Sequence, residues 1–149
     1  MIHTAGQSVF DDRGQITRAL DLSDEPISVI YGTVRGAFGG KSDLSIQVLL
    51  ALAAWKLNQP VRAVWSRSES IRGHAKCHAM TINPRWGATK DGIISAAEVE
   101  IQIDAGAYMY TSSSVLDCLH SICVGPYEIP HITLPDMAVF TNNIPGGVF

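Results

Sequence analysis

A glycine-rich stretch, Val34-Arg-Gly-Ala-Phe-Gly-Gly-Lys-Ser-Asp43, holds the residue types in this chain that are most typical of ligand binding. Its last glycine is followed by Lys41 and Ser42, as in a phosphate-binding loop of the form G-x-x-x-x-G-K-[ST]. That pattern requires a glycine at position 35, where the chain has Arg35, whose side chain resists a positive φ. The nearest glycine, Gly36, is one residue too close to the Gly-Lys-Ser end. The sequence therefore disfavours a nucleotide site.

The elements around this stretch keep a different kind of anion site open. Residues 27–34 are rich in β-branched side chains and predict a strand. The apolar run from about Leu44 to Leu57 predicts a helix that Asp43 would cap, and that is apolar nearly all round and so buried on most sides. A glycine-rich turn entering a helix exposes unpaired N–H groups, which suit an oxo group or a phosphate. The glycines equally allow close strand-to-helix packing, and the stretch alone does not decide.

The rest of the chain predicts an α+β fold, a mixed sheet with packed helices, in a single domain of residues 1–149 without an internal boundary. Residues 11–22 predict a helix capped by Asp11 or Asp12 and otherwise lined by solvated carboxylates. Residues 61–66 predict a strand. Residues 111–124 fit either a helix or a loop, and residues 131–142 predict one more extended segment. Strands and helices show no regular βαβ alternation.

The clearest local pattern is a β-hairpin over residues 77–108. Asp91-Gly92 is a strong hairpin turn signal. In the arm after this turn, apolar residues alternate with polar ones, which is typical of a half-buried strand; the apolar set is Ala97, Val99, Ile101 and Ile103. Glu98 and Glu100 should therefore lie on its polar side. Gly106 is predicted to supply a special backbone angle at the end of this arm.

Charge, apolar runs and cysteines limit the classes of protein. The net charge of −3, without a run of Lys and Arg, excludes a nucleic-acid-binding surface. The longest apolar stretch, Val48 to Trp55, is far shorter than the ~20 residues of a membrane span, and the N-terminus lacks the pattern of a secretory signal. Three cysteines fit a reducing compartment better than a disulfide framework. The sequence therefore predicts a cytoplasmic protein without a membrane partner.

A metal site is the remaining possibility from residue spacing. Cys118, His120 and Cys123 form C-x-H-x-x-C, and Cys77-His78 is the one candidate second pair. A structural zinc site needs four ligands at paired spacings. The sequence therefore favours plain packing roles for these side chains.

Six segments in series resemble those of one enzyme family. In chain order they are RGAFGGKSD, LAAWKLNQPVRAVWSRSES, KCHAM, KDGIISAAEVEIQIDAGAY, GPYEIPHI and FTNNIPGGVF. The chain is similar, over essentially its whole length, to the molybdenum-cofactor-binding subunit of the xanthine dehydrogenase and aldehyde oxidase family. The resemblance implies that the chain is a fragment of a molybdopterin-binding domain.

The resemblance also implies cofactor-binding residues. The backbone N–H groups of Gly36, Ala37, Phe38 and Gly39 would face the ligands of molybdenum and its pterin dithiolene. Gln7 would reach an oxo ligand of the metal. The metal itself is held by the pterin sulfurs, so no metal-ligating side chain is expected. Backbone and amide donors suit electron-rich oxygens without adding charge.

The activity implied by the resemblance is the oxidative hydroxylation of an N-heterocycle or an aldehyde, with oxygen taken from water. Ser42 and Cys118 occupy substrate-binding positions at which purine-hydroxylating members carry Glu and Arg, so xanthine is not expected as the substrate. Arg35 replaces a glycine usual in the family, which would reshape the turn. The KCHAM segment likewise differs from the more usual Lys-Arg-His-Pro.

The family's catalytic Glu lies downstream of the residues matched here, so the isolated chain is expected to be inactive. The implied partners are the remainder of the molybdenum subunit, iron–sulfur and FAD domains or subunits, and a small-molecule substrate. The alternative, left open by the sequence, is a non-catalytic structural or assembly module whose glycine turn only packs.

Overall fold

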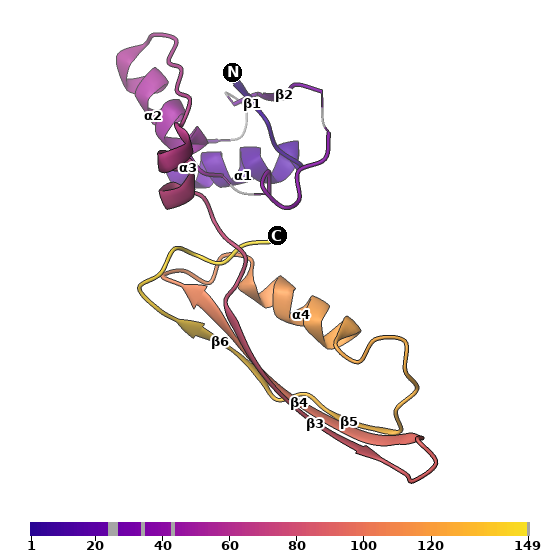
Figure 1. The fold of residues 1–149 in the computed structure, drawn as a ribbon. Helices are drawn as coiled ribbons and strands as arrows, with labels where there is room; N and C mark the ends of the chain where they lie inside the picture. Colours follow the sequence, from indigo (N-terminus) through magenta and orange to yellow (C-terminus); the bar gives the residue numbers. More distant parts are fainter. Residues whose placement is uncertain (24–26, 34, 43, 149) are drawn as a thin grey trace. The chain divides into compact units, whose positions relative to one another are not determined.

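The computed structural model describes residues 1–23, 27–33, 35–42 and 44–148 (Figure 1). These residues form two compact units, Met1–Ala75 and Lys76–Val148, and each is described by itself. The single domain without an internal boundary stays a prediction, because two compact units can belong to one functional domain.

The first unit is built on a short βαβ motif. Strand β1 (Ile2–Thr4) leads into helix α1 (Val9–Leu20), and β2 (Val29–Tyr31) then pairs parallel with β1. The core between them is formed by the buried side chains Ile16, Ile27 and Val29. Parallel strands require such a crossover, and the helix buries its apolar side on the strands. This βαβ motif was not predicted from the sequence, because no regular alternation of strands and helices was found there.

Helix α1 is confirmed, but its predicted cap is wrong. Ser8 is the N-cap, and its hydroxyl oxygen accepts a hydrogen bond from the Asp11 N–H at 3.4 Å. Asp11 and Asp12 lie in the first turn instead, where a negative charge is favoured by the helix dipole. The helix ends at Leu20, followed by Asp21 in the left-handed region at φ 51°.

Helix α2 (Gln47–Leu57) begins later than predicted, after Ile46, which makes no side-chain cap. Asp43, the predicted cap, lies outside the described residues. The predicted burial on most sides is wrong, since only Gln47 is buried and Leu49 and Leu57 are each 64% exposed. Among the described helices and strands, α2 packs mainly on α1 and β1. Apolar periodicity cannot tell which faces of a helix have neighbours.

The segment between α2 and the second unit lacks the strand expected over residues 61–66 and forms a short helix after it. Residues 61–66 pair with no strand among the described residues, so the strand prediction is wrong. Helix α3 (Arg67–Gly73) follows and begins with a capping box, in which Ser66 and Glu69 each bond the other's backbone N–H. A lone apolar stretch without a pairing partner cannot satisfy a strand's hydrogen bonds.

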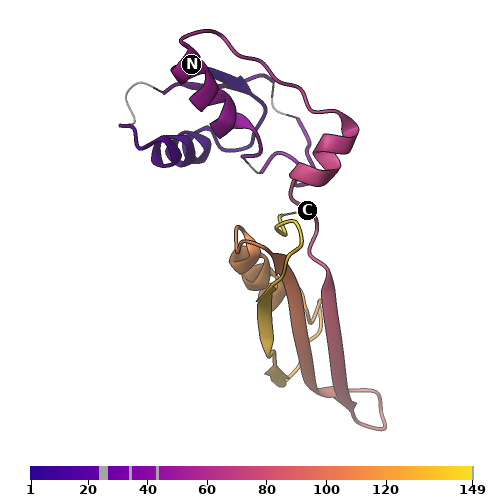
Figure 2. The same cartoon turned by 90° about the vertical axis from the view of Figure 1, so that its left-hand side faces the viewer.

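The second unit is a mixed sheet with one helix on it. Strands β3 (Met80–Ala88) and β4 (Ile94–Gly106) form the antiparallel hairpin predicted from Asp91-Gly92. Two short strands, β5 (His131–Thr133) and β6 (Asp136–Phe140), pair parallel with β4. Helix α4 (Ser112–Ile122), which the sequence left as helix or loop, runs along one face of the sheet (Figures 1 and 2). The predicted α+β class, with a mixed sheet and packed helices, is confirmed.

The alternation predicted for β4 sets the two faces of this sheet. Val99, Ile101 and Ile103 are buried beneath α4, against its side chains Val115, Leu116 and Leu119. The opposite face is polar, as predicted. There the Arg85 guanidinium donates to Glu98 at 2.7 Å, and the Asn83 amide donates to Glu100 at 3.1 Å. One face of β4 therefore holds the core of the unit.

Replacement of Ile103 by alanine tests this core. Ile103 is fully buried, so Ile103→Ala should lower the free energy of unfolding by about 2–5 kcal/mol through lost burial and a cavity. Ile93, at the hairpin turn, is 66% exposed. Ile93→Ala should therefore change the free energy of unfolding by less than about 0.5 kcal/mol. Denaturant unfolding of both variants measures the difference. Equal losses would contradict the burial assigned to β4.

Asp104 fastens the end of β4 to the segment after β6. Its carboxylate accepts hydrogen bonds from the Thr141 hydroxyl at 2.6 Å, the Asn143 amide at 2.6 Å and the Gly106 N–H at 2.8 Å. Gly106 has φ 72°, as the sequence predicted, and a Cβ there would collide with the backbone of the segment that follows Asn143. The hydrogen bonds from Thr141, Asn143 and Gly106, in that order, lower the pKa of Asp104.

This lowered pKa makes a pH-dependent contribution to stability. Because the folded pKa lies below the unfolded value of about 3.9, the contribution is present above that value and is lost as pH falls through the folded pKa. Asp104→Asn should therefore be less stable than the wild type at neutral pH, and the gap should close in acid. Melting temperatures across pH measure it, with Asp117→Asn on the exposed side of α4 as the control. A gap that stays constant into acid would refute the role of the Asp104 charge.

Candidate functional site

The parallel pairing of β1 and β2 brings two loops to one edge of the first unit. Parallel strands place their carboxyl ends together, and ligand sites of α/β units form there. Residues 5–8 follow β1, and the glycine-rich turn follows β2. Gln7 and Ser42 meet as a result, although 35 positions separate them: the Ser42 hydroxyl donates to Gln7 Oε1 at 3.0 Å. The roles predicted for these two residues stay predictions, but the structure brings them into contact.

The glycine-rich turn is closed by two backbone hydrogen bonds. Gly40 N–H donates to the carbonyl of Ala37 at 3.0 Å, and Ser42 N–H donates to that of Gly39 at 3.1 Å. Phe38 and Gly39 both lie in the left-handed region, with φ 49° and 79°. For a phenylalanine this conformation costs roughly 1–2 kcal/mol. The Phe38 side chain is also 97% exposed, so no packing within the described residues repays that cost.

The turn presents unpaired donors and open space. Within the described residues, the N–H groups of Gly36, Ala37, Phe38 and Gly39 have no hydrogen-bond acceptor. Gly36 has no positive φ, and a Cβ placed on it would meet nothing within 4 Å. Neither backbone conformation nor packing thus requires glycine at this position. A glycine that the fold does not need is typical of a backbone that a ligand approaches closely.

Two N–H groups just before α2 already have an acceptor within the first unit, and an anion site where the turn enters this helix stays a prediction. The Oε1 of Gln47 accepts hydrogen bonds from the N–H groups of Ser45 and Ile46, at 2.8 and 2.9 Å. Its Nε2 donates to the Thr4 hydroxyl at the end of β1, at 3.3 Å. Gln47 is buried and ties α2 to β1, beside the loop that carries Gln7. Sequence reasoning missed this role, although a polar residue inside an apolar helix was a usable signal.

The loop that carries Gln7 rests on a buried polar pair. The Tyr31 hydroxyl donates to Asp12 Oδ2 at 2.6 Å. Asp12 is only 5% exposed, so its predicted place on a solvated face is wrong. Burial raises the pKa of Asp12, and burial together with the Asp12 carboxylate raises the pKa of Tyr31. A Cβ on Gly6 would collide with the Tyr31 hydroxyl and lie 2.9 Å from Asp12 Oδ2. Gln7 is thus held between Gly6 and the helix cap Ser8.

Gly6→Ala tests this support. The added methyl group must displace Tyr31 or the loop, so the free energy of unfolding should fall by about 1–3 kcal/mol. Gly14 in α1 is the matched control, because a Cβ there would meet only Arg18 Nη1, at 4.0 Å. Gly14→Ala should therefore be neutral or stabilising. Chemical denaturation compares the two variants, and equal stabilities would show that Gly6 is not crowded.

The second unit holds the other candidate residues. Cys118 is exposed on α4, and its predicted substrate-binding role stays a prediction. His120 Nε2 lies 2.9 Å from Asp136 Oδ1, and buried His78 pairs with Ser112 at 2.8 Å. Burial lowers the pKa of His78. In the part of the chain that the structure describes, no three His, Cys, Asp or Glu side chains gather as metal ligands.

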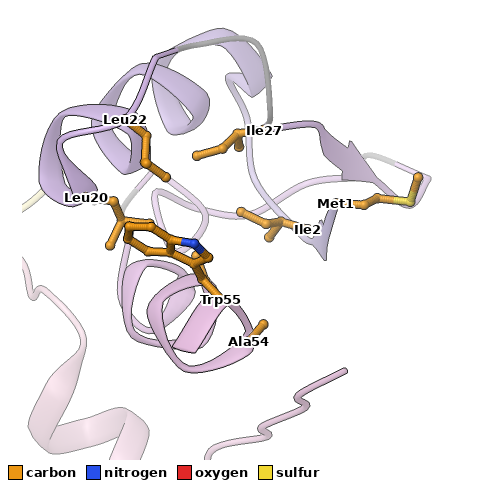
Figure 3. A pocket seen from close by; sticks show the side chains of 8 residues that line it. Met1, Ile2, Leu20, Leu22, Ile27, Ala54 and Trp55 are labelled. Carbon is orange, nitrogen blue, oxygen red and sulfur yellow. The ribbon is translucent and has the colours of Figure 1, made fainter. Parts of the chain in front are cut away.

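An apolar cavity of about 320 Å³ lies elsewhere in the first unit (Figure 3). Side chains from β1, the end of α1 and α2 line it, including Ile2, Leu20, Ile27 and Trp55. No candidate site residue is among its lining residues, and the apolar walls offer no group for acid, base or metal chemistry. Across the residues described, helices also fall short of the length and apolarity that crossing a bilayer demands.

Comparison with known proteins agrees with the resemblance seen in the sequence. The large molybdopterin subunit of nicotinate dehydrogenase from Eubacterium barkeri is 39% identical over 138 residues, which are 93% of this chain and 32% of that subunit. A probable xanthine dehydrogenase subunit from Bacillus subtilis is 38% identical over 148 residues, or 99% of this chain and 20% of that one. The chain thus spans about a third or less of these relatives.

Solved structures share the fold. An aldehyde oxidoreductase from Desulfovibrio gigas matches with a TM-score of 0.89 at 24% identity, over 99% of this chain and 16% of that one. A CO dehydrogenase from Oligotropha carboxidovorans matches with a TM-score of 0.86 at 27% identity, over 98% and 18%. The family model of the molybdopterin cofactor-binding domain matches residues 1–149. The chain therefore belongs to the molybdopterin cofactor-binding domain family, as part of the xanthine dehydrogenase and aldehyde oxidase group.

Proposed function

We propose that the turn Gly36–Gly39, together with Gln7, holds the oxo ligands and pterin of a molybdenum cofactor in a hydroxylase. The observation that carries this proposal is the set of four N–H groups without an acceptor among the described residues, beside the open space at Gly36. Family membership supplies the identity of the ligand. The residues fit it, since neutral donors match electron-rich oxygens.

The chain's own groups have distinct parts in this proposal. The backbone N–H groups of the turn donate to the cofactor, and Gln7 adds one amide donor. Phe38, exposed and already in its strained conformation, would cover the bound group and shield it from water. The cofactor, when bound, supplies the oxidation of the substrate and the uptake of its electrons.

The finer parts of the proposal concern the whole enzyme. Its substrate is an N-heterocycle or an aldehyde other than xanthine, because Ser42 and Cys118 stand where purine-orienting charges are expected. The remainder of the molybdenum subunit supplies the catalytic Glu, so this chain is inactive alone. Iron–sulfur and FAD partners carry the electrons away, in the cytoplasm.

Gly36→Ala separates binding from folding. The fold has room for the methyl group, so the melting temperature should not change, whereas cofactor retention should weaken by about tenfold, corresponding to ~1.4 kcal/mol of crowding against the ligand. The assembled enzyme is purified natively and its molybdenum content is measured. Gly14→Ala is the control and should keep the full molybdenum content, with a melting temperature equal to or above that of the wild type.

Two results would count against the proposal. Absence of molybdenum from the wild-type assembly would overturn it and favour a structural or assembly module. Equal molybdenum contents in Gly36→Ala and Gly14→Ala would show that the turn does not contact the cofactor.

A further inference from the structure

We propose that Ser42 is a positioning residue that fixes the orientation of the Gln7 amide, and that it does not act by touching the substrate. The inference rests on the proposed function, because Gln7 needs an orientation only if its amide faces a ligand. Its basis is the hydrogen bond from the Ser42 hydroxyl to Gln7 Oε1 at 3.0 Å. This bond joins the two loops that follow β1 and β2.

Orientation matters because the two ends of an amide have opposite polarity. Gln7 Nε2 is a donor and suits an electron-rich oxygen, whereas Oε1 would repel one. A glutamine side chain loses about 1.5–2 kcal/mol of rotamer freedom when it is ordered, and Gln7 is exposed, so burial does little to order it. With Oε1 engaged by Ser42, the nitrogen is left to face the ligand. A single hydrogen bond thus selects the useful end of the amide.

Ser42 is itself held in place, as a positioning residue must be. Its N–H donates to the carbonyl of Gly39 at 3.1 Å, which closes the glycine-rich turn. The backbone of Gln7 is confined from the other side, since Gly6 lies against Tyr31 and Ser8 caps α1. Contacts thus restrain the backbone at Ser42 and on both sides of Gln7. The turn thus supplies the backbone donors and, through Ser42, orients the amide donor of Gln7.

A double-mutant cycle in the assembled enzyme separates this role from substrate contact. Ser42→Ala should lower kcat by about fivefold, the equivalent of ~1 kcal/mol for one hydrogen bond, with KM unchanged. In a Gln7→Ala background the same substitution should have no further effect on kcat, because the Gln7 amide that Ser42 orients in this proposal is absent. Ser42→Thr keeps a hydroxyl and should restore kcat. Ser68→Ala, on the exposed side of α3, is the control and should match the wild type.

A spectroscopic readout accompanies the kinetics. If Gln7 faces the metal's oxygen, the Mo(V) electron paramagnetic resonance signal of Ser42→Ala should shift toward that of Gln7→Ala, at an unchanged molybdenum content. Additive losses in the double variant, a change confined to KM, or a wild-type signal in Ser42→Ala would each overturn the inference while leaving cofactor binding intact. A wild-type enzyme without molybdenum would instead overturn the proposed function, and this inference with it.

Discussion

The parallel pairing of β1 with β2 is the constraint on which the candidate site depends. Each strand has only three residues, yet their pairing places two loops at one edge. A slip of one residue would turn Val29 out of the core and separate the loops. The pairing is held from two sides, by the buried Ile16 of α1 and by the hydrogen bond of Gln47 to Thr4. The glycine-rich turn inherits its place from these contacts.

The parts of the fold that were predicted are local in the chain. The hairpin of β3 and β4 could be predicted because the turn at Asp91-Gly92 and the alternation along β4 lie within one stretch. The pairing of β1 with β2 could not, because three-residue strands carry almost no periodic signal and their partner is 27 positions away. The same limit explains residues 61–66, which look strand-like but have no pairing partner among the described residues. Pairing at a distance is a tertiary property.

The site divides in a similar way. Gln7 and the turn around Phe38 could be named only because the motifs resembled a known family. Asp12 and Gln47 could not be placed from sequence, because a polar residue is buried only where the fold supplies its partner, here Tyr31 and Thr4. In the sequence, Asp12 lies among charged residues and Gln47 lies in an apolar run, so neither pattern predicts a buried hydrogen bond. Their function in the fold is to hold the two loops, which explains why polarity is tolerated there.

The strained backbone of Phe38 has a consequence for the rate and strength of ligand capture. A loop that must adopt a rare conformation on binding loses affinity, and its association is slowed by that rearrangement. Phe38 already has φ 49° in this structure. The free-energy cost of that conformation is therefore part of folding and is not added when a ligand binds. If the turn holds the proposed cofactor, it is preorganised for it, and encounter rather than rearrangement should limit how fast the cofactor binds. The conformation of Phe38 would then affect the rate of cofactor insertion as well as the strength of binding.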